Sequence, residues 1–151
     1  MALIETELRD AVGVVTMNNP AKRNALSEAL TDAMHAALER FREQKARAVV
    51  LRAAAGSRIW SAGHDVHELP HTRRDPLAWN DPLRHIIRAI TEFPAPIIAM
   101  VEGGVWGGAC ELALSCDLLV ATADSTFAIT PAKLGIPYNM TGLLNFLNAV
   151  P

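Results

Sequence analysis

The sequence lacks most of the features that mark secreted, membrane-spanning or nucleic-acid-binding proteins. It has two cysteines, Cys110 and Cys116, in 151 residues. Small disulfide-rich scaffolds use more cysteines in shorter chains, so we expect both thiols to be reduced core residues. The longest apolar stretches, residues 97–101 and 118–121, are far too short to cross a bilayer.

The first ten residues and the balance of charges give no sign of a signal peptide or of a charged binding face. The first ten residues contain Glu5, Glu7, Arg9 and Asp10 and no apolar run like that of a signal peptide. The formal net charge is −2, and no basic stripe favours nucleic acid or another polyanion. Half of the residues are apolar, as in ordinary globular domains. We therefore expect one domain over residues 1–151, cytoplasmic, with neither membrane nor nucleic acid as a partner.

Strand and helix signals alternate along the chain. Short β-branched or buried runs predict strands, and Ser27 and the Asp81-Pro82 pair are typical of helix starts. Predicted strands cover residues 4–8, 12–17, 47–52, 97–101, 117–121 and 126–129. Predicted helices follow Ser27 and Asp81 and also cover residues 109–115 and 143–147, whereas residues 53–66 and 102–108 are predicted loops. This alternation predicts an α/β fold with a sheet covered by helices.

Two glycine-containing loops are the best candidates for chemistry. They are Ser61-Ala62-Gly63-His64-Asp65 and Trp106-Gly107-Gly108-Ala109-Cys110-Glu111. Small residues let a ligand approach the backbone, and the N–H groups at a helix start have no intrahelical partner. One N–H from each loop would form an oxyanion hole for a single carbonyl oxygen. The alternative from spacing alone is that these glycines only serve tight turns.

Four motifs, in this order and spacing, resemble the enoyl-CoA hydratase/isomerase (crotonase) superfamily. They are Asn19-Pro20-Ala21-Lys22-Arg23-Asn24-Ala25-Leu26-Ser27, Ser61-Ala62-Gly63-His64-Asp65, Glu102-Gly103 to Gly108-Ala109-Cys110-Glu111-Leu112, and Ser115-Cys116-Asp117-Leu118. The resemblance implies a spiral of ββα units, a CoA thioester as substrate, and trimers or dimers of trimers. Family members are longer than this chain, so the resemblance also implies that their C-terminal helical part is lacking here.

The resemblance also implies roles for individual residues. The backbone N–H groups of His64 and Gly108 would form the oxyanion hole. The expected acyl-CoA-binding set consists of Lys22 and Arg23 near the CoA phosphates, Ala62, Asp65 and Val66 lining the adenine site through their backbone, and Ala25. CoA is then part of the substrate, and no separate cofactor is expected.

Finer details favour one branch of the superfamily. The hydratases use two glutamates, of which the first matches Glu111 and the second would fall at Ala132. The sequence instead resembles methylmalonyl-CoA decarboxylases. That resemblance rests on Ser61-Ala62-Gly63-His64-Asp65-Val66-His67-Glu68-Leu69-Pro70, Arg74-Asp75-Pro76-Leu77, Asp81-Pro82-Leu83-Arg84, Val105-Trp106-Gly107-Gly108 and Gly135-Ile136-Pro137-Tyr138-Asn139.

The chemistry of decarboxylation agrees with this choice. Loss of CO2 from a malonyl-type thioester leaves an enolate, whose charge an oxyanion hole stabilises without a base. A second glutamate would repel the substrate carboxylate, and Ala132 removes that repulsion. We expect Tyr138 to lie beside the departing carboxylate or the enolate carbon, and Thr130 to orient the carboxylate by a hydrogen bond.

Other interpretations stay open at this stage. Glu111 is equally compatible with a helix residue whose carboxylate is satisfied internally, and Tyr138 with simple packing. His64, His67 and Glu68 do not have His-Glu-x-x-His spacing, so we expect no metal. Alternative functions are another crotonase reaction, such as enoyl-CoA hydration or isomerisation, and an inactive acyl-CoA-binding or oligomerisation module.

Overall fold

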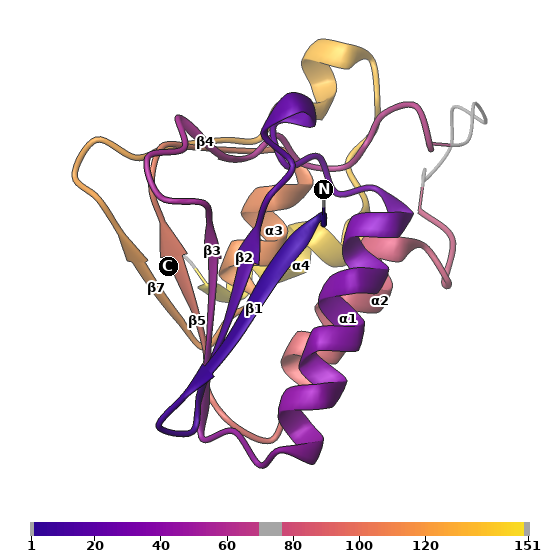
Figure 1. The fold of residues 1–151 in the computed structure, drawn as a ribbon. Coiled ribbons are helices and arrows are strands. Elements are labelled where there is room, and N and C mark those ends of the chain that lie inside the picture. The colour runs from indigo at the N-terminus through magenta and orange to yellow at the C-terminus, as the bar shows by residue number, and fades with distance from the viewer. Residues whose placement is uncertain (1, 70–76, 150–151) are drawn as a thin grey trace.

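The computed structural model describes residues 2–69 and 77–149 (Figure 1). Pro70 and Arg74-Asp75-Pro76, which belong to the stretches used in the sequence comparison above, lie outside the described residues. So do the last two residues of the chain.

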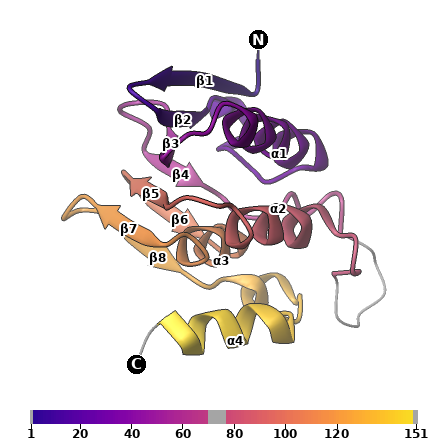
Figure 2. The same ribbon diagram turned by 90° about the horizontal axis from the view of Figure 1, so that it is seen from below.

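The chain winds through four successive units of two strands and a helix. The first three are β1 (Ile4–Arg9), β2 (Val12–Met17) and α1 (Glu28–Glu43); β3 (Ala48–Ala53), β4 (Ile59–Ser61) and α2 (Pro82–Thr91); and β5 (Ile97–Val101), β6 (Gly104–Trp106) and α3 (Gly108–Leu114). The fourth is β7 (Leu118–Ala121), β8 (Thr126–Ala128) and α4 (Met140–Ala149). Short 3-10 turns, η1 (Pro20–Lys22) and η2 (Pro131–Leu134), precede α1 and α4. The units stack as successive layers, which confirms the predicted ββα spiral (Figure 2).

Two sheets run through the stack. The larger has the order β1-β2-β3-β5-β7, and the smaller has the order β4-β6-β8. Among the strands of the described residues, only the β1–β2 hairpin is antiparallel, and the other pairs of neighbouring strands are parallel. Each unit therefore adds one strand to each sheet from β3 onward, and the loops after the smaller sheet's strands lie along one edge of the molecule.

Local sequence explains how the two long helices begin. The Ser27 hydroxyl accepts a hydrogen bond from the Leu30 N–H at 3.3 Å, and the Asp81 carboxylate accepts one from Leu83 N–H at 2.9 Å. Both are the N-caps predicted from the sequence. Pro82 occupies the first turn of α2, where its missing N–H costs no helical hydrogen bond.

The structure corrects two loop predictions. Residues 53–66 contain strand β4, and residues 102–108 contain strand β6. Each strand is only three residues long. Runs this short give no periodicity to recognise, and Gly103 and Gly104 suggested a loop.

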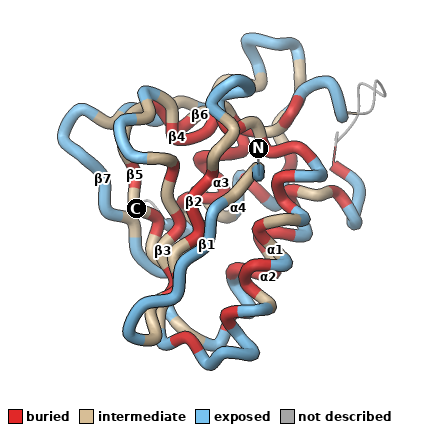
Figure 3. Tube along the Cα trace, viewed as in Figure 1, coloured by how far each residue is buried: buried red, intermediate tan, exposed pale blue. Residues whose placement is uncertain are grey.

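The core lies between the sheets and helices of the first three units. Trp60, Leu30, Ile86 and Leu112 are all completely buried. Burial is dense in β2, β5 and α3, whereas β7 and much of α4 are exposed (Figure 3). None of the helices in the described part of the chain has the length and apolar character needed to cross a membrane.

Candidate active site

The two predicted loops meet at the point where β4 ends and α3 begins. Gly63 has a φ of +87°, and a Cβ there would lie 2.3 Å from the Trp106 carbonyl oxygen and 3.0 Å from the Gly108 nitrogen. A Cβ at position 108 would lie 3.4 Å from the His64 nitrogen and 2.7 Å from Leu83 Cδ2. Gly63 therefore permits a backbone contact that a side chain would obstruct, whereas a Cβ at Gly108 would be crowded by the Leu83 side chain.

The N–H groups of His64 and Gly108 are available at this junction. Leu26 pairs with the residues on either side of His64, because its N–H donates to the Gly63 carbonyl and its carbonyl accepts from Asp65 N–H. Gly108 is the first residue of α3, so its N–H has no acceptor within the helix. Within residues 2–69 and 77–149, neither N–H donates a hydrogen bond.

Two adjoining cavities surround these groups. The inner cavity, of about 70 Å³, lies between the two loops, α2 and the segment before α4. The outer cleft, of about 850 Å³, opens toward η1 and η2. The predicted residues that line the inner cavity are Ala62, His64, Val66, Gly108, Glu111, Thr130 and Tyr138. Those that line the outer cleft are Lys22, Arg23, Ala25, Ala62, His64, Asp65, Val66 and Thr130. The structure thus brings all the predicted site residues to one continuous surface.

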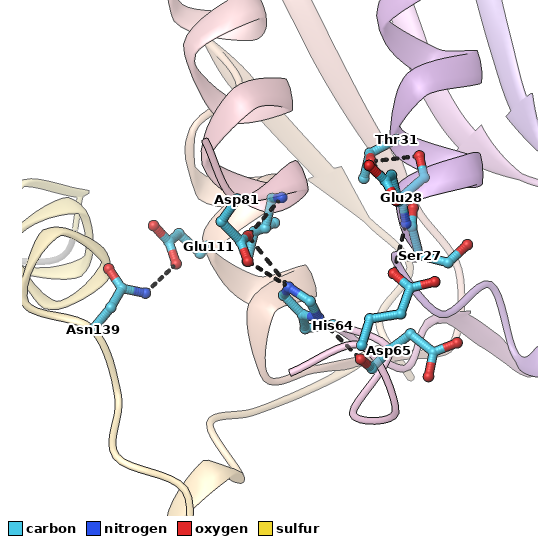
Figure 4. A network of polar contacts seen from close by, with 10 residues as sticks. Ser27, Glu28, Thr31, His64, Asp65, Asp81, Glu111 and Asn139 are labelled. Carbon is cyan, nitrogen blue, oxygen red and sulfur yellow. Dashed lines mark hydrogen bonds and ion pairs between the residues drawn. The ribbon is translucent and has the colours of Figure 1, made fainter. Parts of the chain in front are cut away.

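The His64 ring is held on both sides (Figure 4). Its Nε2 lies 3.2 and 3.3 Å from the two oxygens of Asp81, and its Nδ1 lies 3.1 Å from the Asp65 carbonyl oxygen. Burial alone would lower the pKa of His64, but the hydrogen bond and charge of Asp81 outweigh it, and the pKa is raised. The ring therefore links the first loop to the start of α2.

Glu111 points toward α4 (Figure 4). Its carboxylate accepts hydrogen bonds from Asn139 at 3.3 Å, Tyr138 at 3.4 Å and Asn145 at 3.3 Å. Burial raises the pKa of Glu111, and these donors together with the charge of Arg84 only partly offset it. The carboxylate is thus satisfied internally and also lines the inner cavity.

The other two predicted catalytic residues belong to the fourth unit. Tyr138 packs against Phe146, with ring centroids 5.7 Å apart, and burial raises the pKa of its hydroxyl. Thr130 lies across the cavity, where its hydroxyl would be 3.9 Å from a Cβ at Gly107. Ala132 itself is exposed on η2, and its neighbour Pro131 lines the inner cavity instead.

The outer cleft has basic side chains at its rim. At its base, two backbone N–H groups already donate hydrogen bonds within the chain. Lys22 Nζ lies 3.3 Å from a carboxylate oxygen of the buried Asp65. The N–H groups of Ala62 and Asp65 donate to the carbonyls of Arg23 and Leu26. A ligand at these two residues must therefore use other backbone atoms than the two N–H groups.

Comparison with known proteins decides the family. The model of the enoyl-CoA hydratase/isomerase family matches residues 7–151. The chain belongs to this family. It is 51% identical to methylmalonyl-CoA decarboxylase of Escherichia coli (strain K12) over 89% of its own length and 51% of that protein. It is 32% identical to a probable mitochondrial enoyl-CoA hydratase of Dictyostelium discoideum, over 96% of its own length and 52% of that protein.

Solved structures agree with this assignment to the enoyl-CoA hydratase/isomerase family. A methylmalonyl-CoA decarboxylase in complex with 2S-carboxypropyl-CoA matches 97% of this chain and 56% of its own, with a TM-score of 0.92 and 46% identity. The chain therefore spans about half the length of the relatives that it matches.

The described residues offer no candidate metal centre, and both of their cysteines are free. No group of three or more potential metal ligands occurs among those residues. Cys110 and Cys116 are free thiols, as predicted, and burial raises the pKa of Cys116 to about 12.

Sequence reasoning in this family member missed the residues that support the site. Asp81 was predicted as a helix cap, but not as the partner of the His64 ring. Asn139 and Asn145 were not predicted to bind Glu111. Gly142 was also missed, although a Cβ there would lie 2.6 Å from Glu111 Oε2. Gly142 and Phe146 are four residues apart on α4 and both contact Tyr138, so this helical spacing was the available signal.

Proposed function

We propose that this chain provides the acyl-CoA site of an enzyme that removes CO2 from methylmalonyl-CoA or a related malonyl-type thioester. The observation that carries the proposal is the pair of unpartnered N–H groups, from His64 and Gly108, beside the inner cavity. Among the described residues that line this cavity, Glu111 is the single acidic side chain, and most of the others are apolar. Such a lining suits a reaction in which a charged carboxylate becomes neutral CO2.

The reaction needs no base to begin. The thioester oxygen accepts hydrogen bonds from His64 N–H and Gly108 N–H, and the bond between C2 and the carboxylate carbon breaks. Its electron pair forms the enolate, whose charge collects on the thioester oxygen, and CO2 leaves. One proton is then taken up at C2, which gives propionyl-CoA. Tyr138 would lie beside C2, and Thr130 would orient the carboxylate before it departs.

The outer cleft would hold the CoA part of the substrate. Lys22 and Arg23 at its rim supply positive charge for the phosphates, and Ala25, Ala62, Asp65 and Val66 line its wall. In this scheme CoA enters as part of the substrate, and the chemistry calls for neither metal nor further cofactor. We also propose a homotrimer or a dimer of trimers, which light scattering after size-exclusion chromatography would test.

Turnover assays test the reaction. The chain is incubated separately with methylmalonyl-CoA and with crotonyl-CoA, and the products are separated by chromatography. We expect propionyl-CoA and CO2 from the first substrate and much slower hydration of the second. Efficient hydration without decarboxylation would overturn the proposal. Binding of propionyl-CoA without turnover of either substrate would favour an inactive acyl-CoA-binding module instead.

One observation favours a second reaction of the same family. Glu111 lines the inner cavity, and burial raises its pKa, which suits a group that exchanges protons with a substrate carbon. Double-bond isomerisation uses such proton exchange. An assay with a 3-enoyl-CoA distinguishes it, because Glu111→Gln should abolish isomerisation but leave most of the decarboxylation.

A further inference from the structure

The His64 ring meets a hydrogen-bond acceptor at each nitrogen. A neutral imidazole has one N–H donor and one lone pair, whereas an imidazolium has two donors. Nδ1 faces the Asp65 carbonyl oxygen, which can only accept, and Nε2 faces both oxygens of Asp81. The Asp81 carboxylate also caps α2, so it lies at the positive end of the helix dipole. An imidazolium is the only protonation state in which both ring nitrogens donate.

Asp81 is connected to both oxyanion loops. It contacts the first loop through the His64 ring, and the ring and the carboxylate are 9% and 8% exposed. It contacts the second through α2, because Leu83, which it caps, packs against Gly108. A change at Asp81 therefore reaches the two residues whose N–H groups are the proposed donors.

We propose that His64 is held as an imidazolium between Asp81 and the Asp65 carbonyl, and that Asp81 is thereby a positioning residue for the oxyanion hole. The positioning role rests on the proposed function of the two N–H groups, whereas the charge state of the ring does not. The ion pair fixes the loop that carries His64 N–H, so its loss would misplace one donor. Small misplacements of a catalytic group cost up to about a hundredfold in rate.

The same pair makes the site sensitive to high pH. Deprotonation of His64 removes one of its two donors and the ion pair. Charged and titratable groups that share a cavity or an electrostatic contact with His64 are Asp81, Asp65, Glu68, His67, Lys22, Arg23, Glu111, Lys133 and Tyr138. Among them Asp81 alone contacts the ring with its side chain. The alkaline limb of activity should therefore follow the titration of His64.

Asp81→Asn is the decisive variant, because asparagine keeps the helix cap and removes the charge. Asp10→Asn is the matched control: Asp10 is exposed in the β1–β2 turn, and its φ of +49° suits asparagine. Nitrogen NMR of ¹⁵N-histidine-labelled chain reports both ring nitrogens directly, and His64→Gln assigns the signal among the five histidines.

In the native chain and Asp10→Asn, we expect the two His64 nitrogens to titrate from the doubly protonated form with a pKa above the ordinary 6.5. In Asp81→Asn the pKa should fall below that of the native chain. A native pKa at or below 6.5, or an unchanged pKa in Asp81→Asn, would overturn the assignment. This measurement needs no substrate, so it stands even if methylmalonyl-CoA is not turned over.

The positioning role is tested by kinetics on methylmalonyl-CoA. Asp81→Asn should lower kcat about tenfold or more with little change in KM, and should move the alkaline limb to lower pH. Asp10→Asn should leave both unchanged. If Asp81→Asn shifts the His64 titration but neither kcat nor the limb, the ion pair exists and the positioning role is wrong. If the native chain releases no CO2, the proposed function fails instead.

Discussion

The first three ββα units and the fourth are held in place by different interactions. Helix α1 buries Leu30, Met34, Leu38 and Phe41, and α3 is buried at all positions from 108 to 113. In α4 the only buried residue is Gly142, and Leu144 and Leu147 are 55% and 73% exposed. Apolar packing therefore builds the first three units, whereas the helix of the fourth is joined to α3 by polar contacts to Glu111, with Phe146 packed beside the core. The candidate site lies across this boundary.

The boundary also separates two kinds of site residue. The proposed oxyanion donors, His64 and Gly108, come from loops braced by the packed core. Thr130 and Tyr138 come from the fourth unit. In the proposed reaction, stabilisation of the enolate charge would therefore depend on the deeply packed first three units. The contacts to the departing carboxylate would come from the less deeply packed fourth unit.

The largest effect expected from this division is at Gly108. Gly108→Pro deletes the N–H at the first position of α3, where proline is compatible with a helix. Loss of one oxyanion donor costs about a hundred- to a thousandfold in rate, or roughly 3–4 kcal/mol. Turnover of methylmalonyl-CoA measures the loss, and circular dichroism checks the fold.

Gly108→Ala is the matched control for that variant. It places a Cβ at the same crowded position, beside Leu83, but keeps the N–H. Its loss, like that of His64→Ala and of Tyr138→Phe in the fourth unit, should be smaller than that of Gly108→Pro. Equal losses in the proline and alanine variants would mean that crowding, rather than the missing donor, explains the effect.

The next effect concerns stability. Leu112 on α3 is fully buried, so Leu112→Ala should lower the free energy of unfolding by about 2–5 kcal/mol. Leu144 on α4 is exposed, and Leu144→Ala should change the free energy of unfolding by less than about 0.5 kcal/mol. Urea denaturation of both variants checks the contrast. Similar losses in the two would show that α4 contributes to the core as strongly as α3 does.

A smaller and more local effect is expected where the fourth unit meets the third. A Cβ at Gly142 would lie 2.6 Å from Glu111 Oε2 and 2.7 Å from Tyr138 Cε1, so Gly142→Ala should push α4 away. Such crowding costs about 1–3 kcal/mol. Hydrogen exchange should speed up at α4 amides and stay unchanged in α1. The exposed neighbour Thr141→Ala serves as control, and unchanged exchange in Gly142→Ala would contradict the proposed anchoring.

Much of the first three units could be predicted from sequence because their signals are local. Ser27 and Asp81 mark helix starts by their side chains, and β2 and β5 are runs of β-branched and apolar residues. The glycines of the two loops, with the motif resemblance, were sufficient to predict the positions of His64 and Gly108. Strands β4 and β6 were missed because three residues carry no period, and only pairing with one another and with β8 makes them strands.

The supporting contacts of the site could not be predicted from the sequence because they join distant segments. His64 and Asp81 are 17 residues apart, and Glu111 and Asn145 are 34 residues apart. No local pattern connects such pairs. Each residue also has an ordinary explanation of its own, because Asp81 caps a helix, and Glu111 and Asn145 are polar residues on helices. Only the spiral places the start of α2 above the first loop and α4 against α3.

The smallest predicted effect is a difference in sign between the pH dependences of stability of two buried carboxylates, Asp65 within the first three units and Glu111 at their boundary with the fourth. Burial would raise the pKa of Asp65, but the His67 N–H and Lys22 outweigh it, so the folded pKa lies below 3.8. Its contribution to stability is therefore present above the unfolded pKa and is lost as the pH falls through the folded pKa. Burial raises the pKa of Glu111 above 4.5, so its contribution is greatest below the unfolded pKa and is lost as the pH rises through the folded pKa.

Two neutral isosteres separate these contributions. Relative to the native chain, Glu111→Gln should gain stability as the pH rises from about 4.5 and level off above the folded pKa of Glu111, because the native carboxylate must ionise while buried. Asp65→Asn should lose relative stability as the pH rises toward about 4 and level off above the unfolded pKa, because the native chain gains the charged contacts to Lys22 and His67 that asparagine lacks. Thermal unfolding from pH 3 to pH 8 measures both differences.

Since the Lys22 side chain is 63% exposed, we expect less than about 1 kcal/mol from its ion pair with Asp65. Slopes of the same sign in the two variants would mean that Glu111 is held by its α4 donors as a stabilised anion, and that the fourth unit is anchored by charge rather than by neutral hydrogen bonds.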